Sequence, residues 1–219
     1  MRALITGGTG KVGSAIAVRL EREGWNVVAV GRGDGDLSTV AAARGVVEAA
    51  AERLGGLDLL VNAASEGFRP LPVEQLQEDD WDAAFGATAK GSFFVTQAAA
   101  PFLRESRGVV VMIEDVAGYQ PWPSFAAHCA AKAAQAMLTR VFARALAPEV
   151  RVCGIAPGPV AVEPDQIERR AAETLVGRVG SPDDVADAVV FLAGADFVTG
   201  TTLVVDGGRL LQSTRTEQP

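Results

Sequence analysis

The sequence has few of the residues that mark secreted, metal-binding or membrane proteins. It holds two cysteines, one histidine and one tyrosine among 219 residues. Cys129 and Cys153 lack CxxC spacing, which favours reduced, inert thiols over a disulfide framework or a metal site. No apolar run reaches the roughly 18 residues of a membrane-spanning helix, and the chain enters a strand pattern without a signal-peptide pattern. We therefore expect a cytoplasmic protein with no membrane contact and no bound metal.

Positive charge is also scarce. Lysine and arginine number 20 against 27 acidic residues, which gives a formal net charge of −7. Nonspecific binding to DNA depends on cations that neutralise phosphates, so we expect no nucleic-acid partner. Hydrophobic residues are abundant at 48%, and a chain of this length can bury a substantial core. We expect a single domain over residues 1–211 and a flexible polar tail over residues 212–219.

Short β-rich runs alternate with longer alanine-rich stretches, which is typical of βαβ units and a parallel sheet. We predict strands at residues 3–6, 26–30, 57–62, 108–113, 151–155 and 202–205. We predict helices at residues 11–23, 39–54, 79–104, 125–146, 164–174 and 183–192. The predicted fold class is therefore α/β, with a doubly wound parallel sheet.

A glycine-rich segment, TGGTGKVG at residues 6–13, follows the first strand and opens the first helix. Glycines in this context let the backbone turn tightly and approach a pyrophosphate, whose charge then lies at the helix N-terminus. An ordinary strand-to-helix loop is the alternative. The residues expected around the pyrophosphate are Thr6, Gly7, Thr9, Gly10, Lys11, Val12 and Gly13.

The residues after the second strand bear on the choice between NAD and NADP. NAD sites place an acid here to accept from the ribose hydroxyls, whereas NADP sites place a cation near the 2′-phosphate. The position reads Gly31-Arg32, and Lys11 lies inside the glycine-rich segment, so the pattern favours NADP(H). The alternative is that Arg32 is a solvated loop residue and that Asp34 or Asp36 serves a ribose.

Later segments resemble, in order, those of the short-chain dehydrogenase/reductase family. Residues 60–65 read LVNAAS, similar to the family's NNAG segment, residues 156–160 read APGPV, and residues 205–208 read VDGG. With the glycine-rich segment and the helix that carries Lys132, the resemblance runs from residue 1 to about residue 211. It implies a Rossmann-type nicotinamide dinucleotide site that includes Asn62, Ala63, Ala64, Lys132, Pro157, Gly158 and Val160.

Within that family the sequence is most similar to the pteridine reductases. These have a basic residue where Lys11 lies, a serine where Ser65 lies, and an aspartate at the usual catalytic serine position, which maps onto Asp115. The connection after Arg32 is shorter than in the family, which implies six parallel strands rather than seven. Asp36 and Leu37 resemble the family's adenine-contacting pair from the missing strand.

The catalytic Tyr-x-x-x-Lys of the family maps onto residues 128–132, which read HCAAK. His128 therefore replaces the tyrosine, and Tyr119, the only tyrosine, lies nine residues upstream and out of register. Thr88 replaces the family's relay asparagine. The resemblance implies that Lys132 binds the nicotinamide ribose, and a histidine can donate a proton because its ordinary pKa is about 6.5. His128 could also face the cofactor without a catalytic part, and Asp115 could merely bond the next loop.

Two functions stay open. The first is an NADP(H)-dependent reductase of a small carbonyl or pterin-like substrate, in which His128 or a bound water is the proton donor. The second is a catalytically silent dinucleotide-binding or cofactor-sensing homologue. The resemblance also implies a homo-oligomer, expected to be a tetramer. The candidate substrate contacts are Ser65, Phe68, Tyr119 and Trp122, each of which could instead serve packing.

Overall fold

The computed structural model describes residues 1–66 and 69–212. In this part of the chain, six strands form one parallel sheet in the order β2-β1-β3-β4-β5-β6. This confirms the predicted Rossmann-type sheet of six strands. The strands are β1 (Arg2–Thr6), β2 (Asn26–Val30), β3 (Leu59–Asn62), β4 (Val109–Ile113), β5 (Arg151–Pro157) and β6 (Thr202–Val205).

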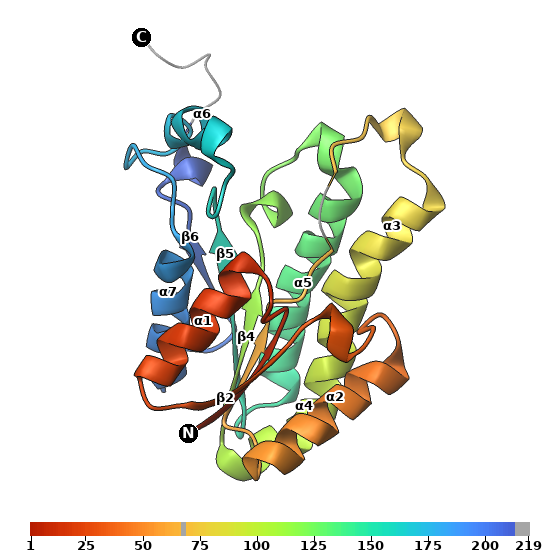
Figure 1. The fold of residues 1–219 in the computed structure, drawn as a ribbon, viewed down its shortest axis with the longest axis vertical. Coiled ribbons are helices and arrows are strands. Elements are labelled where there is room, and N and C mark those ends of the chain that lie inside the picture. Colours follow the sequence, from red (N-terminus) through yellow and green to blue (C-terminus); the bar gives the residue numbers. More distant parts are fainter. Residues whose placement is uncertain (67–68, 213–219) are drawn as a thin grey trace.

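Helices cover both faces of the sheet (Figure 1). One face packs against α1 (Lys11–Arg22) and α7 (Pro182–Gly194). The other packs against α2 (Val40–Leu54), α4 (Gly91–Ser106) and α5 (Ala126–Ala145). Two hydrophobic clusters result, one on each side of the strands.

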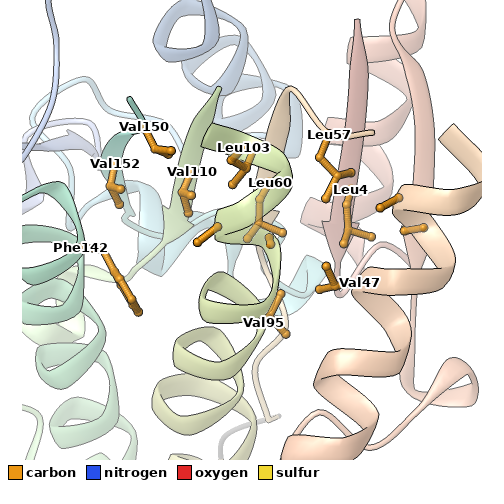
Figure 2. Packing of buried hydrophobic residues seen from close by; sticks show 14 of the residues in the cluster. Leu4, Val47, Leu57, Leu60, Val95, Leu103, Val110, Phe142, Val150 and Val152 are labelled. Carbon is orange, nitrogen blue, oxygen red and sulfur yellow. The ribbon is translucent and has the colours of Figure 1, made fainter. Parts of the chain in front are cut away.

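The central strands are almost wholly apolar because their side chains alternate between two faces of the sheet and both faces are buried. Neighbouring residues of a strand point to opposite faces. Leu60 therefore joins the cluster of Val95 and Phe142 (Figure 2), whereas Val61 joins the cluster beneath α1 and α7. Both Leu60 and Val61 are fully buried, and each such side chain contributes about 1.5–3 kcal/mol to folding.

The strand order places a topological switch between β1 and β3. The chain leaves β1 for β2 on one side and returns to β3 on the other. Ligands of open parallel sheets bind at the carboxyl ends of strands that flank such a switch. The connection that follows β2 is short, because one 3-10 turn, Arg32–Asp34, precedes α2.

The long helix predicted at residues 79–104 is wrong in one respect, because the structure divides it. Glu78–Phe85 forms α3, Gly86–Lys90 forms a π-helical turn, and α4 then begins at Gly91. Ser92 Oγ donates to the Thr88 and Ala89 carbonyls within this widened turn. Such π-turns are frequent at functional sites.

The predicted helix at residues 164–174 is shorter in the structure. A 3-10 turn at Pro164–Gln166 leads into α6 (Ile167–Ala171), and the segment then turns. Thr174 Oγ1 lies within hydrogen-bonding distance of the Ala171 and Arg178 carbonyls, which replaces the helical pattern. The predicted tail beyond Gln212 lies outside the described residues. Within residues 1–66 and 69–212, no helix is long and apolar enough to cross a bilayer.

Candidate active site

The glycine-rich segment forms a tight cradle between β1 and α1. Gly7 has a φ of +68°, and a Cβ there would lie 2.5 Å from the Ala63 carbonyl oxygen. A Cβ at Gly13 would collide with the Gly7 carbonyl, and one at Gly31 would collide with Thr9 Oγ1. Gly10 caps α1 without a side-chain hydrogen bond. The first N–H groups of α1 are thus left for an anion, as a dinucleotide pyrophosphate requires.

A cavity of about 660 Å³ opens beside this cradle, within the size range of small-molecule sites. The short connection after β2 supplies one wall of this cavity. Nine predicted residues line this cavity: Gly7, Thr9, Gly10, Arg32, Asp36, Leu37, Ala63, Ala64 and Ser65. Thr6 and Asn62 are buried at the strand ends instead, at 1% exposure each. These residues fit a nicotinamide dinucleotide.

Both cations expected to meet a 2′-phosphate are paired with carboxylates. Arg32 Nη2 lies 3.0 Å from Glu66 Oε1, and Lys11 Nζ lies 2.8 Å from Glu163 Oε1. Asp34 accepts from the Gly31 backbone N–H at 2.8 Å, so it closes the local turn. A phosphate at either cation would have to displace a carboxylate. The sequence pattern did not reveal these acids, because they lie far along the chain.

The three residues predicted for catalysis come together at the carboxyl end of β4. Asp115 Oδ1 accepts from the Ala117 N–H at 2.8 Å, which fixes the carboxylate at the start of a 3-10 turn, Val116–Gly118. Its other oxygen, Oδ2, lies 3.3 Å from His128 Nε2. His128 lies in the first turn of α5 and is 7% exposed. The carboxylate can therefore orient the imidazole.

Lys132 lies one helical turn beyond His128. Its Nζ donates to the Ile113 carbonyl at 2.8 Å and to Gln135 Oε1 at 3.1 Å. Burial lowers the Lys132 pKa to about 8, and the charges of Asp115 and Glu114 oppose that change. An ammonium has three N–H donors, so one remains for a ribose hydroxyl. Gln135 was missed in the sequence, because only the fold reveals that it contacts the lysine.

Thr88, the residue expected at the place of the relay asparagine, lies in the π-helical turn. Its Oγ1 lies 3.2 Å from Ser65 Oγ, and Thr88 is 1% exposed. Gln135 rather than Thr88 contacts the Lys132 ammonium. Ser65 also lines the large cavity, so Thr88 supports a residue of the proposed cofactor site.

Tyr119 is engaged away from the Asp115–His128 pair. Its hydroxyl donates to Glu114 Oε2 at 2.6 Å and lies 3.1 Å from Thr202 Oγ1. Burial and the adjacent Glu114 carboxylate raise the Tyr119 pKa to about 12. Glu114 is itself buried and accepts from Thr139 at 2.6 Å. A carboxylate at the end of an apolar strand was the sequence signal for this network, and it was overlooked.

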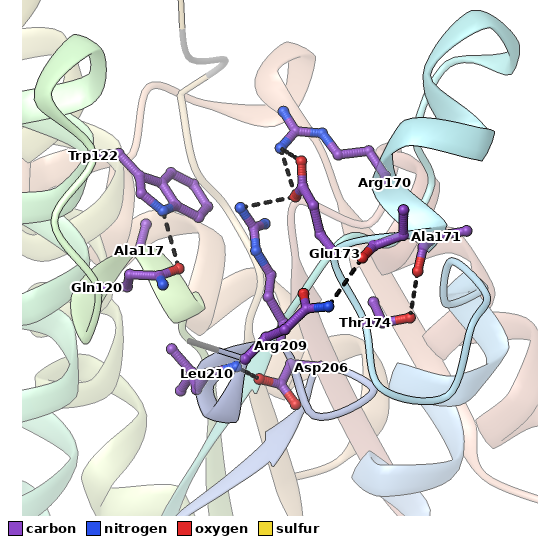
Figure 3. A network of polar contacts seen from close by, with 12 residues as sticks. Ala117, Gln120, Trp122, Arg170, Ala171, Glu173, Thr174, Asp206, Arg209 and Leu210 are labelled. Atoms are coloured by element: carbon purple, nitrogen blue, oxygen red, sulfur yellow. Dashed lines mark hydrogen bonds and ion pairs between the residues drawn. The ribbon is translucent and has the colours of Figure 1, made fainter. Parts of the chain in front are cut away.

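The remaining predicted residues lie around the carboxyl ends of β5 and β6. The Gly158 N–H donates to the Val205 carbonyl at 2.9 Å, which holds the segment that begins at Pro157 against β6. Val160 bridges to Gly180. Trp122 packs beneath the Arg209 guanidinium, 4.8 Å from the ring centroid (Figure 3). Phe68 lies outside the described residues.

Comparisons with known proteins identify relatives of this chain. The family described as enoyl-(acyl carrier protein) reductase matches residues 34–209. The 4-formylbenzenesulfonate dehydrogenase TsaC1/TsaC2 of Comamonas testosteroni is 34% identical, over 94% of this chain and 96% of its own length. A Xanthobacter autotrophicus protein named inactive 2-(S)-hydroxypropyl-CoM dehydrogenase 2 is 35% identical, over 79% and 82%.

One of the similar solved structures contains a nicotinamide cofactor. The 3-ketoacyl-(acyl-carrier-protein) reductase of Brucella melitensis, in complex with NADH, superposes with a TM-score of 0.87 at 30% identity, covering 94% of this chain and 97% of that one. The chain belongs to the short-chain dehydrogenase/reductase family. It is thus an oxidoreductase of a family that binds nicotinamide dinucleotides.

Proposed function

We propose that this protein is an NADP(H)-dependent reductase of a small carbonyl compound, with His128 as the proton donor. The observation that carries the proposal is the 3.3 Å approach of His128 Nε2 to Asp115 Oδ2, one helical turn from buried Lys132. NADP(H), when bound, supplies the hydride. His128 gives a proton to the carbonyl oxygen, directly or through one water, because an imidazole is shorter than the phenol it replaces.

Asp115 and Lys132 support that proton transfer. Asp115, itself fixed by the Ala117 N–H, holds the orientation of the His128 ring, as carboxylates do for catalytic histidines. Lys132 retains one N–H donor for the nicotinamide ribose. In this arrangement the role of Lys132 is to orient the cofactor. It has no catalytic tyrosine beside it to act on.

The preference for NADP(H) is supported by Arg32 and Lys11. Arg32 lines the large cavity, and both side chains are exposed enough to exchange a carboxylate for a phosphate. A pterin-like substrate is supported by Lys11, Ser65 and Asp115, the residues that resemble pteridine reductases. The relatives named above support a carbonyl or alcohol more broadly, since one is named for an aromatic aldehyde.

A second function is favoured by one relative. The 35%-identical Xanthobacter protein is named inactive, and the loss of the catalytic tyrosine fits a silent, cofactor-binding homologue equally well.

We further propose that residues 1–211 act as one NADP(H)-binding domain in the cytoplasm and assemble as a homotetramer. The alanine-rich α4 and α5 helices favour close pairing in such an assembly.

One set of variants separates these functions. Wild type, His128→Ala and His128→Tyr are assayed for NADPH oxidation on a panel of aldehydes, diketones and quinonoid pterins. If His128 is the acid, His128→Ala lowers the rate by about 10²–10⁴-fold, and His128→Tyr keeps or raises it because Lys132 lies in the family's position. Cofactor binding with no turnover in wild type would establish the silent function. Equal, measurable rates in wild type and His128→Ala would exclude histidine as the acid.

A further inference from the structure

Arg209 lies at a junction between two segments that flank the Asp115–His128 pair (Figure 3). Its guanidinium carbon lies 4.8 Å from the ring centroid of Trp122, on the loop that joins Asp115 to α5. Its Nη2 lies 3.0 Å from Glu173 Oε2, on the segment that follows α6. Arg209 follows β6 after a turn at residues 206–208, so three separate parts of the chain meet at one side chain.

The guanidinium has more donors than the protein satisfies. An arginine carries five N–H donors, and a buried one normally fills them. Arg209 has a side chain that is 14% exposed, and Glu173 is its one ion-pair partner among the described residues. Glu173 is shared, because both of its oxygens also lie within 3.1 Å of Arg170 Nη1. Stacking on Trp122 uses the face of the guanidinium and leaves its N–H edges open.

Other carboxylates near Arg209 are already engaged. Asp206 accepts from the Gly208 and Leu210 N–H groups at 2.7 Å each, which fixes the turn that carries Arg209. Asp115 is bonded to Ala117 and lies against His128. Burial lowers the Arg209 pKa, the charges of Glu173, Asp115 and Asp206 oppose that change, and the charge of Arg170 adds to it. Cys129, the residue after His128, has its Sγ 3.9 Å from the Trp122 carbonyl, so the ring beneath Arg209 borders the proposed reaction site. Among the described residues, no carboxylate binds Arg209 in a bidentate manner.

We propose that Arg209 binds a carboxylate of the substrate while the substrate's carbonyl lies at Asp115 and His128, so that the protein acts on oxo acids. A guanidinium held on an aromatic ring is pre-organised for bidentate binding of a carboxylate, which adds specificity as well as affinity. This inference rests on the reductase function proposed above. It adds the class of substrate and assigns Arg209 as a specificity-determining residue.

The test compares 4-formylbenzoate with its neutral isostere 4-formylbenzamide, which present the same aldehyde. Wild type is expected to favour the acid in kcat/KM by about 10-fold or more, from one charge-assisted contact. Arg209→Gln removes that preference, so the ratio of kcat/KM for the acid to that for the amide falls toward one. Arg169→Gln, an exposed arginine of α6, is the matched control and keeps the preference. Equal rates on both aldehydes in wild type would overturn the inference.

Glu173→Gln should change the preference for the acid substrate in the direction opposite to Arg209→Gln. It removes the carboxylate that competes for Arg209, so the preference for the acid should increase, which a merely structural role would not produce. This variant decides the question if Arg209→Gln does not fold, and an unchanged or reduced preference counts against the inference.

Absence of all turnover would refute the proposed function alone. Calorimetric titration of the NADP⁺-bound protein with benzoate and benzamide then tests Arg209 separately. Tighter binding of benzoate that Arg209→Gln abolishes would support the inference, and equal binding of the two ligands would overturn it.

Discussion

The preference for NADPH over NADH depends on whether a 2′-phosphate can displace Glu66 from the Arg32 guanidinium. Arg32 is 78% exposed, and such an ion pair contributes less than about 1 kcal/mol. A charge-assisted hydrogen bond from arginine to phosphate contributes about 1.5–3 kcal/mol. The phosphate should therefore displace Glu66. Arg32→Gln is expected to lower the affinity for NADPH by about 10- to 100-fold. Glu66→Gln is expected to raise that affinity by at most about fivefold.

Calorimetric titration of NADPH and NADH measures both effects. The matched control is Glu74→Gln, which removes an exposed acid outside the cofactor cavity and should leave both affinities unchanged. NADH lacks the phosphate, so its affinity should change little in Arg32→Gln. High salt should reduce the differences because these charges are exposed. Tighter binding of NADH than NADPH by wild type, or equal weakening of both by Arg32→Gln, would refute the charge argument.

Three further predictions follow from the buried network, the lysine and the assembly. Tyr119→Phe should lower the free energy of unfolding, measured in urea, by about 1–3 kcal/mol, because it removes the hydrogen bond from the Tyr119 hydroxyl to Glu114. The reductase rate should stay unchanged. A large loss of rate would instead identify Tyr119 as the proton donor. Lys132 has a pKa of about 8 when folded against an ordinary 10.5, so the unfolded chain binds more protons between these values. Stability should accordingly rise from about pH 8 to 10, by at most about 3 kcal/mol, and Lys132→Met should abolish this rise. Above about pH 10 the raised Tyr119 pKa acts in the opposite direction, because the folded protein then holds the extra proton. Light scattering at micromolar concentration should give the mass of a tetramer, and a monomer mass would contradict that proposal.

The sequence by itself determined the strands, the glycine-rich cradle and the contact between two residues predicted for catalysis, Asp115 and His128. Each is encoded locally. β2 and β6 have the predicted bounds because short apolar runs end at glycine or polar residues. Asp115 and His128 come together because Asp115 follows the end of β4 and His128 lies in the first turn of α5, the next long element. A spacing along the chain is enough to predict such a contact when one short connection, here two 3-10 turns, joins the two elements.

The tertiary structure alone decided which charges neutralise one another. Glu66 reaches Arg32 from 34 residues away, and Glu173 reaches Arg209 from another segment, without a pattern that links either pair in the sequence. The predicted helix at residues 79–104 likewise divides at a π-turn where Ser92 bonds two carbonyls. Glu114 and Thr202 lie against the hydroxyl of Tyr119, a candidate substrate contact, and Thr202 comes from a strand 83 residues further along the chain. Long-range electrostatic and hydrogen-bond partners depend on how the loops at the carboxyl edge of the sheet pack, and local periodicity holds no information about that packing.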